Sequence, residues 1–342
     1  MRVRVPDYFD QFSCLAGACP HSCCIGWEVV LDDETVRRYR GLPGPLGRRL
    51  RAAMRDDGED VCFPLNGGRC PFLNRENLCE IHCALGPEAT SVTCREHPRF
   101  IEEYGPFREI TLSAACPKAN ELLLGSPAAL TFSEFTDGET EEEGDDWLDW
   151  LVPLRDWLLN LLGDRRQPLA NRLRTFLLTA QGAQNLLDAE DFEGLAAFCK
   201  IPGPVSAPLG ETCGWERAAC RCLRALDILE PDWKALLRRW AEEPPVPFAP
   251  REPEKLERIA VYFAFRHLLK AVNDGDLLGR AQLCVLGVLT VNRLSGFVGL
   301  PEALRLFSRE IEHDEENLDA LLDAFWQEEG LSPAALYAAL EG

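Results

Sequence analysis

Four cysteines fall within the eleven residues from Cys14 to Cys24, at spacings of five, four and one. Thiolates bind zinc and iron strongly, and short spacings allow one loop to surround a single ion or cluster. The pattern therefore predicts a metal-binding or iron–sulfur module at the start of the sequence. Six more cysteines follow in the next hundred residues: Cys62, Cys70, Cys79, Cys83, Cys94 and Cys116.

Disulfides or buried free thiols would also account for cysteines, but the sequence favours neither for this cluster. A disulfide framework is typical of small secreted domains, whereas the chain opens MRVRVPDYFD, without the apolar segment of a secretory signal. We therefore expect a cytoplasmic protein. Buried free cysteines explain single positions such as Cys199 or Cys284, because a thiol packs as a small apolar group. They do not explain four cysteines in eleven residues.

The adjacent pair Cys23 and Cys24 carries a geometric constraint. Neighbouring side chains leave a helix about 100° apart and leave a strand on opposite faces, so both thiols rarely reach the same ion. We expect either that one of them packs or that the module holds two centres.

Short local elements must position these thiols. Trp27 to Leu31 is β-branched and apolar, which predicts a strand, and Asp32 or Asp33 is a candidate N-cap for the helix that follows. Apolar patches on both sides of the polar turn at residues 74–77 suit a knuckle that brings Cys70 and Cys79 together. Proline after Cys19, Cys70 and Cys116 leaves each of these thiols at a loop corner.

The remaining sequence predicts a second, helical domain. A chain of 342 residues usually forms two domains. We expect a mainly α protein with a small irregular cysteine-rich domain at residues 1–125, an acidic linker at 126–146 and an all-α domain at 147–342. Nine acidic residues and no basic ones between Glu134 and Asp149 mark the linker. Helical periodicity marks 147–161, 169–187, 215–229, 233–240, 256–272, 277–294 and 304–325.

Composition and missing motifs exclude several classes of function. A net charge of −20 argues against nucleic-acid binding. The sequence contains no run of eighteen apolar residues, so we expect no membrane span. Neither a Rossmann fingerprint, a Walker A loop, G-x-S-x-G nor H-E-x-x-H occurs. The three-cysteine loop of radical S-adenosylmethionine enzymes, with spacings of four and three, is also absent.

A second polar concentration lies at residues 308–317, SREIEHDEEN. On a regular helix Glu310, His313 and Asn317 would share a face, where His313 could act as a general base or a proton relay. Alternatively, Arg309, Glu312 and Glu316 form exposed ion pairs and His313 caps or packs. Composition alone favours the second interpretation, because charged helix faces are usually solvated.

Six segments together resemble the flagellin lysine N-methylase family: FSCLAGACPHSCCIGWEVVLDDET, CPFLNRENLCEIH, TCREHPRF, LSAACP, YFAFRH and SREIEHDEENLD. The likeness extends from Phe12 to about Asp323. It implies methyl transfer from S-adenosylmethionine to lysine side chains of flagellin, the protein substrate and partner. The resemblance also implies an iron–sulfur cluster in the N-terminal domain. Its implied ligands are Cys14, Cys19, Cys23, Cys24, Cys70, Cys79, Cys94 and Cys116.

Eight thiolates would satisfy two 4Fe-4S clusters, or one cluster and a second metal, with zinc as the alternative metal. Cys62 and Cys83 fall outside the family's pattern. A cluster could be structural, bind the amino-carboxylate end of S-adenosylmethionine, or donate an electron that cleaves it. The sequence does not choose among these roles.

Methyl transfer to an amine requires the neutral nitrogen, whereas free lysine has a pKa of about 10.4. Glu310 and His313 are the candidate catalytic residues, as acceptors of the lysine proton. The alternative function is a non-enzymatic metal-binding or redox-sensing protein whose helical domain docks a partner. The location of an S-adenosylmethionine site stays open.

Overall fold

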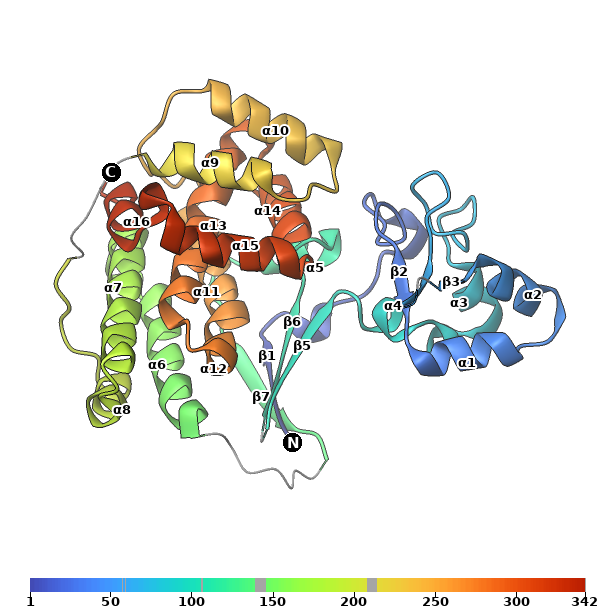
Figure 1. Ribbon diagram of the computed structural model, residues 1–342, viewed down its shortest axis with the longest axis horizontal. Coiled ribbons are helices and arrows are strands. Elements are labelled where there is room, and N and C mark those ends of the chain that lie inside the picture. Colours follow the sequence, from blue (N-terminus) through green and yellow to red (C-terminus); the bar gives the residue numbers. More distant parts are fainter. Residues whose placement is uncertain (57, 59, 106, 139–145, 208–213, 342) are drawn as a thin grey trace.

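The structure is a computed structural model that describes residues 1–56, 58, 60–105, 107–138, 146–207 and 214–341. Two lobes lie side by side, and each has its own hydrophobic core (Figure 1). The core of the smaller lobe draws on residues between Val29 and Ala89. Tyr8 and buried residues between Tyr104 and Leu130 pack with the helices of the larger lobe. Both ends of the segment 1–125 therefore pack in the larger core.

The smaller lobe consists of short elements around a small sheet. Its strands follow the order β2-β4-β3 and are antiparallel. As predicted, Asp32 is the N-cap of the helix after the first of these strands, and its carboxylate accepts from the backbone N–H of Thr35 at 2.9 Å. The elements are β2 (Val29–Leu31), α1 (Asp33–Gly41), α2 (Gly44–Ala53), β3 (Arg55–Asp56), β4 (Val61–Phe63), α3 (Glu80–Leu85) and α4 (Val92–Glu96).

A four-stranded mixed sheet lies between the smaller lobe and the helices (Figure 1). Its order is β5-β6-β1-β7, formed by β5 (Arg99–Tyr104), β6 (Phe107–Leu112), β1 (Arg2–Pro6) and β7 (Phe132–Thr136). Strand β1 runs parallel to β6 and antiparallel to β7. The segment of β7 was expected to be linker, and it is instead the edge strand of this sheet. Residues 139–145 of the expected linker lie outside the described residues.

Helices form most of the larger lobe, which confirms the mainly α prediction. The long, central α13 packs against α7, α11 and α14. The sheet described above was not expected in this lobe. The helices are α5 (Pro117–Leu124), α6 (Asp146–Gly163), α7 (Leu169–Asp188), α8 (Phe192–Lys200), α9 (Trp215–Ala225), α10 (Pro231–Glu242), α11 (Pro253–His267), α12 (Ala271–Asp274), α13 (Leu277–Val298), α14 (Leu300–Phe307), α15 (Glu315–Gln327) and α16 (Pro333–Ala339).

The predicted continuous helix over residues 304–325 is wrong. Helix α14 passes into a single π-helical turn, Ser308–Glu312, and α15 begins afresh after Asp314. The carboxylate of Asp314 accepts from the backbone N–H of Asn317 at 2.9 Å, which caps the new helix. A π turn widens the helix by one residue and rotates the side chains that follow it. The side chains from Ser308 to His313 therefore point in several directions.

Helix α13 is long and apolar enough to cross a membrane by length and composition alone. However, 67% of its most apolar window is buried inside the structure, as in the core helix of a globular domain.

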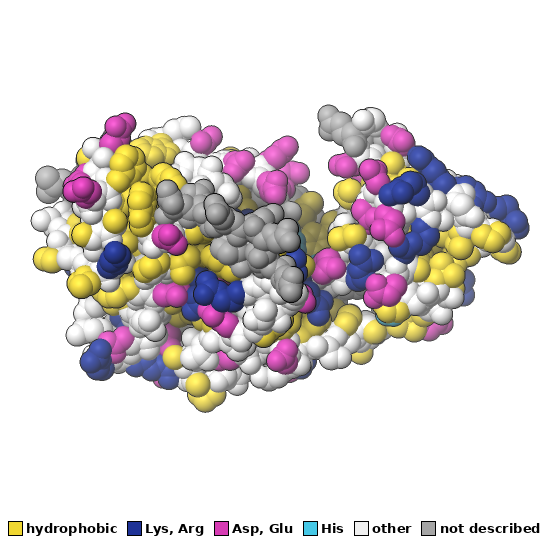
Figure 2. All heavy atoms as spheres, turned by 90° about the horizontal axis from the view of Figure 1, so that it is seen from below, with side chains coloured by type: hydrophobic (Ala, Val, Ile, Leu, Met, Phe, Trp, Pro, Cys, Tyr) yellow, Lys and Arg dark blue, Asp and Glu magenta, His cyan; other side chains and the backbone are white. Residues whose placement is uncertain are grey.

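The surface view shows a notch between the two lobes and acidic side chains over both of them (Figure 2). Basic side chains gather at the outer end of the smaller lobe, where α1 and α2 carry Arg37, Arg38, Arg40, Arg48, Arg49 and Arg51.

Candidate active site

Backbone hydrogen bonds in the smaller lobe bring the predicted thiols together. The N–H of Cys70 donates to the carbonyl oxygen of Cys24 at 2.8 Å, which joins the first cysteine group to the second. Cys79 forms an isolated β-bridge with Leu73 across the polar turn, as the predicted knuckle requires. Every described cysteine is a free thiol.

Four of these thiols, those of Cys24, Cys70, Cys79 and Cys94, form one group. Burial, followed by the effect of the other cysteines of the group, raises the pKa of Cys70 to about 12. The pKa of Cys94 is raised to about 11 by burial and by Cys24 and Cys79. Burial, followed by Cys24 and by the exposed Cys83, raises the pKa of Cys79. Cys24 thus acts on the pKa of each of the other three thiols.

A second group contains Cys14, Cys19 and Cys116: burial, then Cys19 and Cys14, raise the pKa of Cys116, and burial, then Cys14 and Cys24, raise that of Cys19. Cys23 connects the two groups: a hydrogen bond with Cys24 is the main cause of its raised pKa, and Cys14 and Cys94 contribute. We expected the side chains of Cys23 and Cys24 to diverge. They meet because the chain forms a turn here, where the helix and strand geometries do not apply.

Some of the sulfurs lie next to groups that stabilise negative charge. Cys79 and Cys116 are the N-cap residues of α3 and α5, where helix dipoles favour negative charge. Burial raises the pKa of both thiols, and the first backbone N–H groups of each helix act to lower it. Ala16 donates its N–H to the sulfur of Cys14 at 3.3 Å. Such N–H groups are among the features that tune protein-bound iron–sulfur clusters, so the donor set fits a cluster.

A single zinc ion requires a tighter arrangement. With Zn–S bonds of about 2.3 Å, tetrahedral thiolates lie about 4 Å apart. Within the described part of the chain, no three His, Cys, Asp or Glu side chains are arranged to hold an ion directly. Of the remaining cysteines of this lobe, Cys62 lies in β4 with its sulfur 3.5 Å from a carboxylate oxygen of Glu28, and Cys83 is exposed on α3.

The π turn of the larger lobe contacts the smaller lobe through Arg309. Its guanidinium lies 4.1 Å from the centroid of the Trp27 ring, and Nη2 donates to the carbonyl oxygen of Ile25 at 2.7 Å. Nε lies 2.7 Å from a carboxylate oxygen of Glu230. Gly26 fits beneath this guanidinium, since a Cβ there would lie 2.4 Å from Nη2. These contacts form a joint between the lobes.

His313 lies in the same joint. Its Nε2 is 2.7 Å from the hydroxyl oxygen of Ser113, and its ring packs 4.9 Å from Trp27 and 4.7 Å from Phe100, between centroids. The His97 ring is 5.9 Å away. Burial, and then the positive charge of His97, lowers the pKa of His313 to about 3. Burial and Arg309 lower the pKa of His97 to about 4. Both imidazoles are neutral at pH 7 and can accept a proton.

Glu310, the other predicted catalytic residue, points elsewhere. Its carboxylate oxygens accept the backbone N–H groups of Leu229 and Glu230 at 2.9 and 2.8 Å. Asn317 donates to the backbone carbonyl of Glu310 and to that of Asp227. Glu310 and Asn317 thus hold the segment between α9 and α10. The expectation that His313 shares their face is wrong, because the π turn separates them.

Sequence reasoning missed several residues of the joint. Trp27 follows Cys24 by three residues, His97 follows Cys94 by three, and Ser113 precedes Cys116 by three. This recurring offset from a cysteine is a signal that could have singled them out. Ser113 and His313 are 200 residues apart, so no local pattern reveals their contact.

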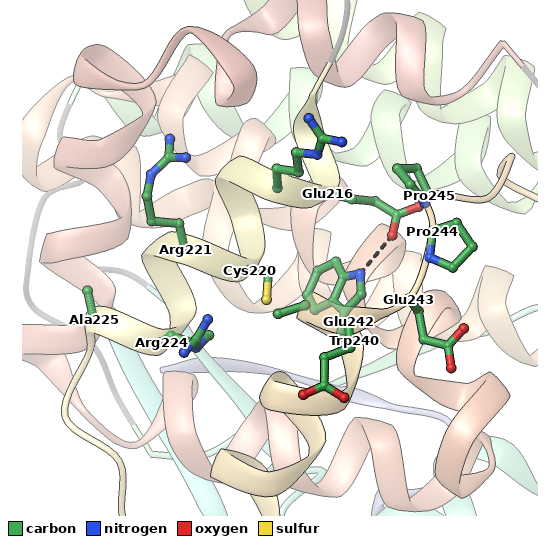
Figure 3. Close-up of a pocket in the computed structure, with 12 residues that line it drawn as sticks. Glu216, Cys220, Arg221, Arg224, Ala225, Trp240, Glu242, Glu243, Pro244 and Pro245 are labelled. Carbon is green, nitrogen blue, oxygen red and sulfur yellow. Dashed lines mark hydrogen bonds between the residues drawn. The ribbon is translucent and has the colours of Figure 1, made fainter.

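A groove lies away from the joint, between α9 and the end of α10 (Figure 3). Its volume is about 810 Å³, and Arg217, Cys220, Arg221, Arg224 and Trp240 are among the residues that line it. Glu216 accepts from the indole N–H of Trp240 at 2.7 Å and from Nε of Arg293 at 2.8 Å. This buried carboxylate therefore holds the side chains of Trp240 and Arg293 in place beside the groove. None of the predicted site residues lines the groove.

Comparisons with known proteins identify three curated relatives. The flagellar biosynthetic protein FliU of Salmonella muenchen is 31% identical over 139 residues, which cover 39% of this chain and 82% of FliU. The Lysine-N-methylases of Salmonella typhimurium and Salmonella choleraesuis are each 32% identical over 141 residues. The match covers 39% of this chain and 35% of each relative, so the chain spans about a third of their length. No family model matches, and no solved structure matches.

Proposed function

Because this chain belongs to the family of FliU and the Lysine-N-methylases, we propose that it is a protein-lysine N-methyltransferase acting on flagellin. The methyl donor in this proposal is S-adenosylmethionine. The observation that carries the proposal beyond family membership is the joint: neutral, half-buried His313 lies where the larger lobe meets the cysteine-bearing lobe.

The proposed reaction requires one proton acceptor for each methyl group. The lone pair of the lysine Nζ attacks the methyl carbon as the bond from that carbon to sulfur breaks. The products are methyl-lysine, S-adenosylhomocysteine and one proton. In this account the neutral imidazole of His313 accepts the proton and relays it to solvent, because an imidazole whose pKa is lowered to about 3 does not keep it. Glu310 has the supporting role of holding the segment from α9 to α10.

The cysteines would hold an iron–sulfur centre. Cys24, Cys70, Cys79 and Cys94 supply one set of four thiolates, and Cys14, Cys19, Cys23 and Cys116 supply a second set. Eight thiolates would satisfy two four-iron clusters, or one cluster and a second metal. When bound, such a centre supplies either a structural crosslink, a binding point for the methyl donor, or a redox function. Trp27, His97 and Ser113, whose side chains lie next to His313, are each three residues from a cysteine of these sets.

Co-expression with flagellin tests the proposed activity. The chain is produced together with flagellin in a host without a lysine methylase of its own, and the flagellin is examined by intact-mass and peptide analysis. We expect mass increments of whole methyl groups, located on lysine Nζ, that are lost in the His313→Gln variant. Unmodified flagellin with a folded, metal-loaded wild-type chain would contradict the proposal.

The second candidate, a metal-binding or redox-sensing protein with a partner-docking helical lobe, is favoured by the close ring packing around His313. Binding calorimetry separates the two functions. A methyltransferase binds S-adenosylhomocysteine, whereas a pure sensor produces no heat of binding. An iron and acid-labile sulfide assay on anaerobically purified protein separates an iron–sulfur centre from zinc.

A further inference from the structure

The guanidinium of Arg309 lies among three groups that together suit a positive charge, two from the smaller lobe and one from the larger. The centroid of the Trp27 ring is 4.1 Å from the guanidinium carbon, and the carbonyl oxygen of Ile25 accepts from Nη2 at 2.7 Å. A carboxylate oxygen of Glu230 lies 2.7 Å from Nε. An aromatic face, a carbonyl oxygen and a carboxylate also suit the ammonium group of a lysine. We call these three groups the cation site.

The part of the cation site that belongs to the smaller lobe is held without Arg309. The indole N–H of Trp27 donates to the carbonyl oxygen of Cys23 at 2.6 Å, which fixes the position of the ring. The backbone N–H of Ile25 donates to the carbonyl oxygen of Ser22 at 3.1 Å. The aromatic face and the carbonyl oxygen therefore keep their places if the guanidinium leaves.

The carboxylate of Glu230 is also held by groups other than Arg309. Its two oxygens accept from Nη1 and Nη2 of Arg305 at 3.0 and 2.9 Å, and Arg305 is buried. The backbone N–H of Glu230 donates to the carboxylate of Glu310 at 2.8 Å. A bidentate pair with a buried guanidinium fixes both the position and the orientation of a carboxylate. All three groups of the cation site are thus preorganised.

Arg309 itself is bound less completely than the groups around it. Its side chain is only 5% exposed, yet among the described residues its Nε–H has no hydrogen-bond acceptor, although the Glu230 carboxylate is close. Burial is the main cause that lowers the pKa of Arg309, against the charge of Glu230. A buried donor without an acceptor is destabilising. Moving the guanidinium into water therefore offsets part of the cost of breaking its contacts.

The cation site adjoins His313. The ring of His313 packs 4.9 Å from that of Trp27, between centroids. After burial, the positive charge of Arg309 is among the causes that lower the pKa of both His97 and His313. Trp27 and His313 are each half-buried, so both side chains reach solvent. A positive group from outside that replaced the guanidinium would therefore lie beside the imidazole of His313.

We propose that the place of the Arg309 guanidinium is the binding site for the substrate's lysine side chain, which enters as Arg309 swings out. The lysine ammonium then takes over the Trp27 face, the Ile25 carbonyl and the Glu230 carboxylate. Arg309 keeps the site closed until the substrate binds. Burial at this place favours the neutral amine that methyl transfer requires. The identity of the occupant as a lysine rests on the proposed function, whereas the cation site itself does not.

Chemical rescue of Arg309→Ala tests the cation site in the full-length protein. The probe is n-butylammonium, which reproduces a lysine side chain from Cβ to Nζ, and n-butanol is its neutral analogue. Hydrogen exchange is measured in peptides covering residues 23–31. We expect saturating n-butylammonium to slow the exchange in Arg309→Ala by at least about fivefold, because it binds only the docked lobes. n-Butanol should have no effect.

Two further variants locate the rescue. Adding Glu230→Gln to Arg309→Ala removes the carboxylate and should abolish the effect of n-butylammonium, while Arg305 keeps its contacts with Glu302. Arg174→Ala removes a guanidinium that lies 4.3 Å from the centroid of another aromatic ring, far from the joint. In this matched control the exchange of residues 23–31 should be as slow as in the wild type, with or without the probe.

Calorimetry with Nα-acetyl-lysine methylamide tests the role of Arg309 in closing the site. In the wild type only the fraction of molecules with Arg309 swung out can bind, which raises the apparent Kd. We expect Arg309→Ala to bind this lysine analogue at least about tenfold more tightly than the wild type. Arg309→Lys keeps a positive charge on a shorter side chain and should have an intermediate Kd. It tests the same role if Arg309→Ala does not fold.

An absence of rescue, or equal rescue by n-butanol, would overturn the cation site. Equal Kd values in the wild type and both variants would overturn the closing role of Arg309. Competition between S-adenosylhomocysteine and the lysine analogue would assign the site to the amino end of the methyl donor and overturn the lysine assignment. Methylation of flagellin is measured on the same samples. Rescue without methylation would contradict the proposed function alone, and methylation without rescue would contradict this inference alone.

Discussion

Arg309 of the larger lobe and Trp27 of the smaller lobe are stacked, with the guanidinium carbon 4.1 Å from the ring centroid. A guanidinium over an indole face is attracted by the ring quadrupole, most strongly where water is excluded. The same guanidinium donates to the backbone of Ile25, so one side chain makes two kinds of contact across the joint. Docking of the smaller lobe should therefore depend strongly on Arg309.

Arg309→Met should loosen the joint without unfolding either core. A hydrogen bond from a charged donor contributes about 1.5–3 kcal/mol, so its loss should speed local opening by about ten- to a hundredfold. Hydrogen exchange measured by mass spectrometry should show this acceleration in peptides covering residues 23–31. Arg238→Met, at an exposed position on α10, is the control. Equal protection in wild type and Arg309→Met would contradict the role of Arg309.

Gly26→Ala should destabilise the joint more than an equivalent substitution elsewhere. Gly26 has φ +92°, and an added Cβ would lie 2.4 Å from Nη2 of Arg309. Gly44 has φ +80° with nothing within 4 Å of the added Cβ, so Gly44→Ala is a matched control for backbone strain alone. Strain at such a φ costs about 1–3 kcal/mol in both variants. Urea unfolding should show a larger loss for Gly26→Ala, and equal losses would show that the contact with Arg309 does not matter.

One buried and two half-buried histidines make stability depend on pH. Burial is the main cause that lowers the pKa of His97 and His267 to about 4 and that of His313 to about 3, against about 6.5 in an unfolded chain. Below pH 6.5 the unfolded chain therefore binds more protons than the folded one. Their contribution is complete above pH 6.5 and is lost as the pH falls toward 4, by up to about 1.4 kcal/mol per pH unit for each histidine.

The variant His267→Gln tests the direction of this pH dependence. The free energy of unfolding, measured in urea between pH 5.5 and 8, should fall less steeply toward low pH in His267→Gln than in the wild type. The number of protons taken up on unfolding, given by this slope, should be lower in His267→Gln by nearly one. Parallel curves would show that His267 is protonated in the folded protein, as an ion pair with Glu312.

Serine substitutions at Cys79 and Cys83 should distinguish a proposed cluster ligand from a cysteine outside the ligand set. Cys79 belongs to the group of four thiols, whereas Cys83 is exposed one turn later. We expect Cys79→Ser to lower the iron content of anaerobically purified protein by half or more, because one ligand set is lost. Cys83→Ser should keep the wild-type iron and sulfide content. The opposite order would show that the thiol groups are assigned incorrectly.

Local sequence signals predicted the local features of this protein. The capping role of Asp32 and the knuckle between Cys70 and Cys79 depend on residues within ten positions of one another, and the strand before Asp32 has a β-branched sequence of its own. Helical periodicity likewise revealed the mainly α body. Features that depend on long-range contacts were missed. Strand β7 forms by pairing with β1, more than a hundred residues earlier, and the acidic residues around it concealed the strand.

The π turn explains why the prediction of one helix over residues 304–325 was wrong. The sequence from Leu304 to Phe325 has the periodicity of one helix, yet Arg309, Glu310, Glu312 and His313 each meet a different partner. Tertiary contacts to Ile25, Leu229, His267 and Ser113 accompany the inserted residue, and none of them is visible locally. The sequence thus identified His313 as a candidate, whereas its partners required the structure.

Methyl transfer by the purified protein tests the central claim most directly. Anaerobically purified chain is incubated with flagellin and methyl-labelled S-adenosylmethionine, and labelled methyl-lysine is counted by mass spectrometry. We predict labelled methyl groups on lysine Nζ with the wild-type chain and at least about a hundredfold slower labelling with His313→Gln, as expected for loss of a general base. Flagellin that remains unlabelled with wild-type protein, or equal labelling by both proteins, would contradict the account.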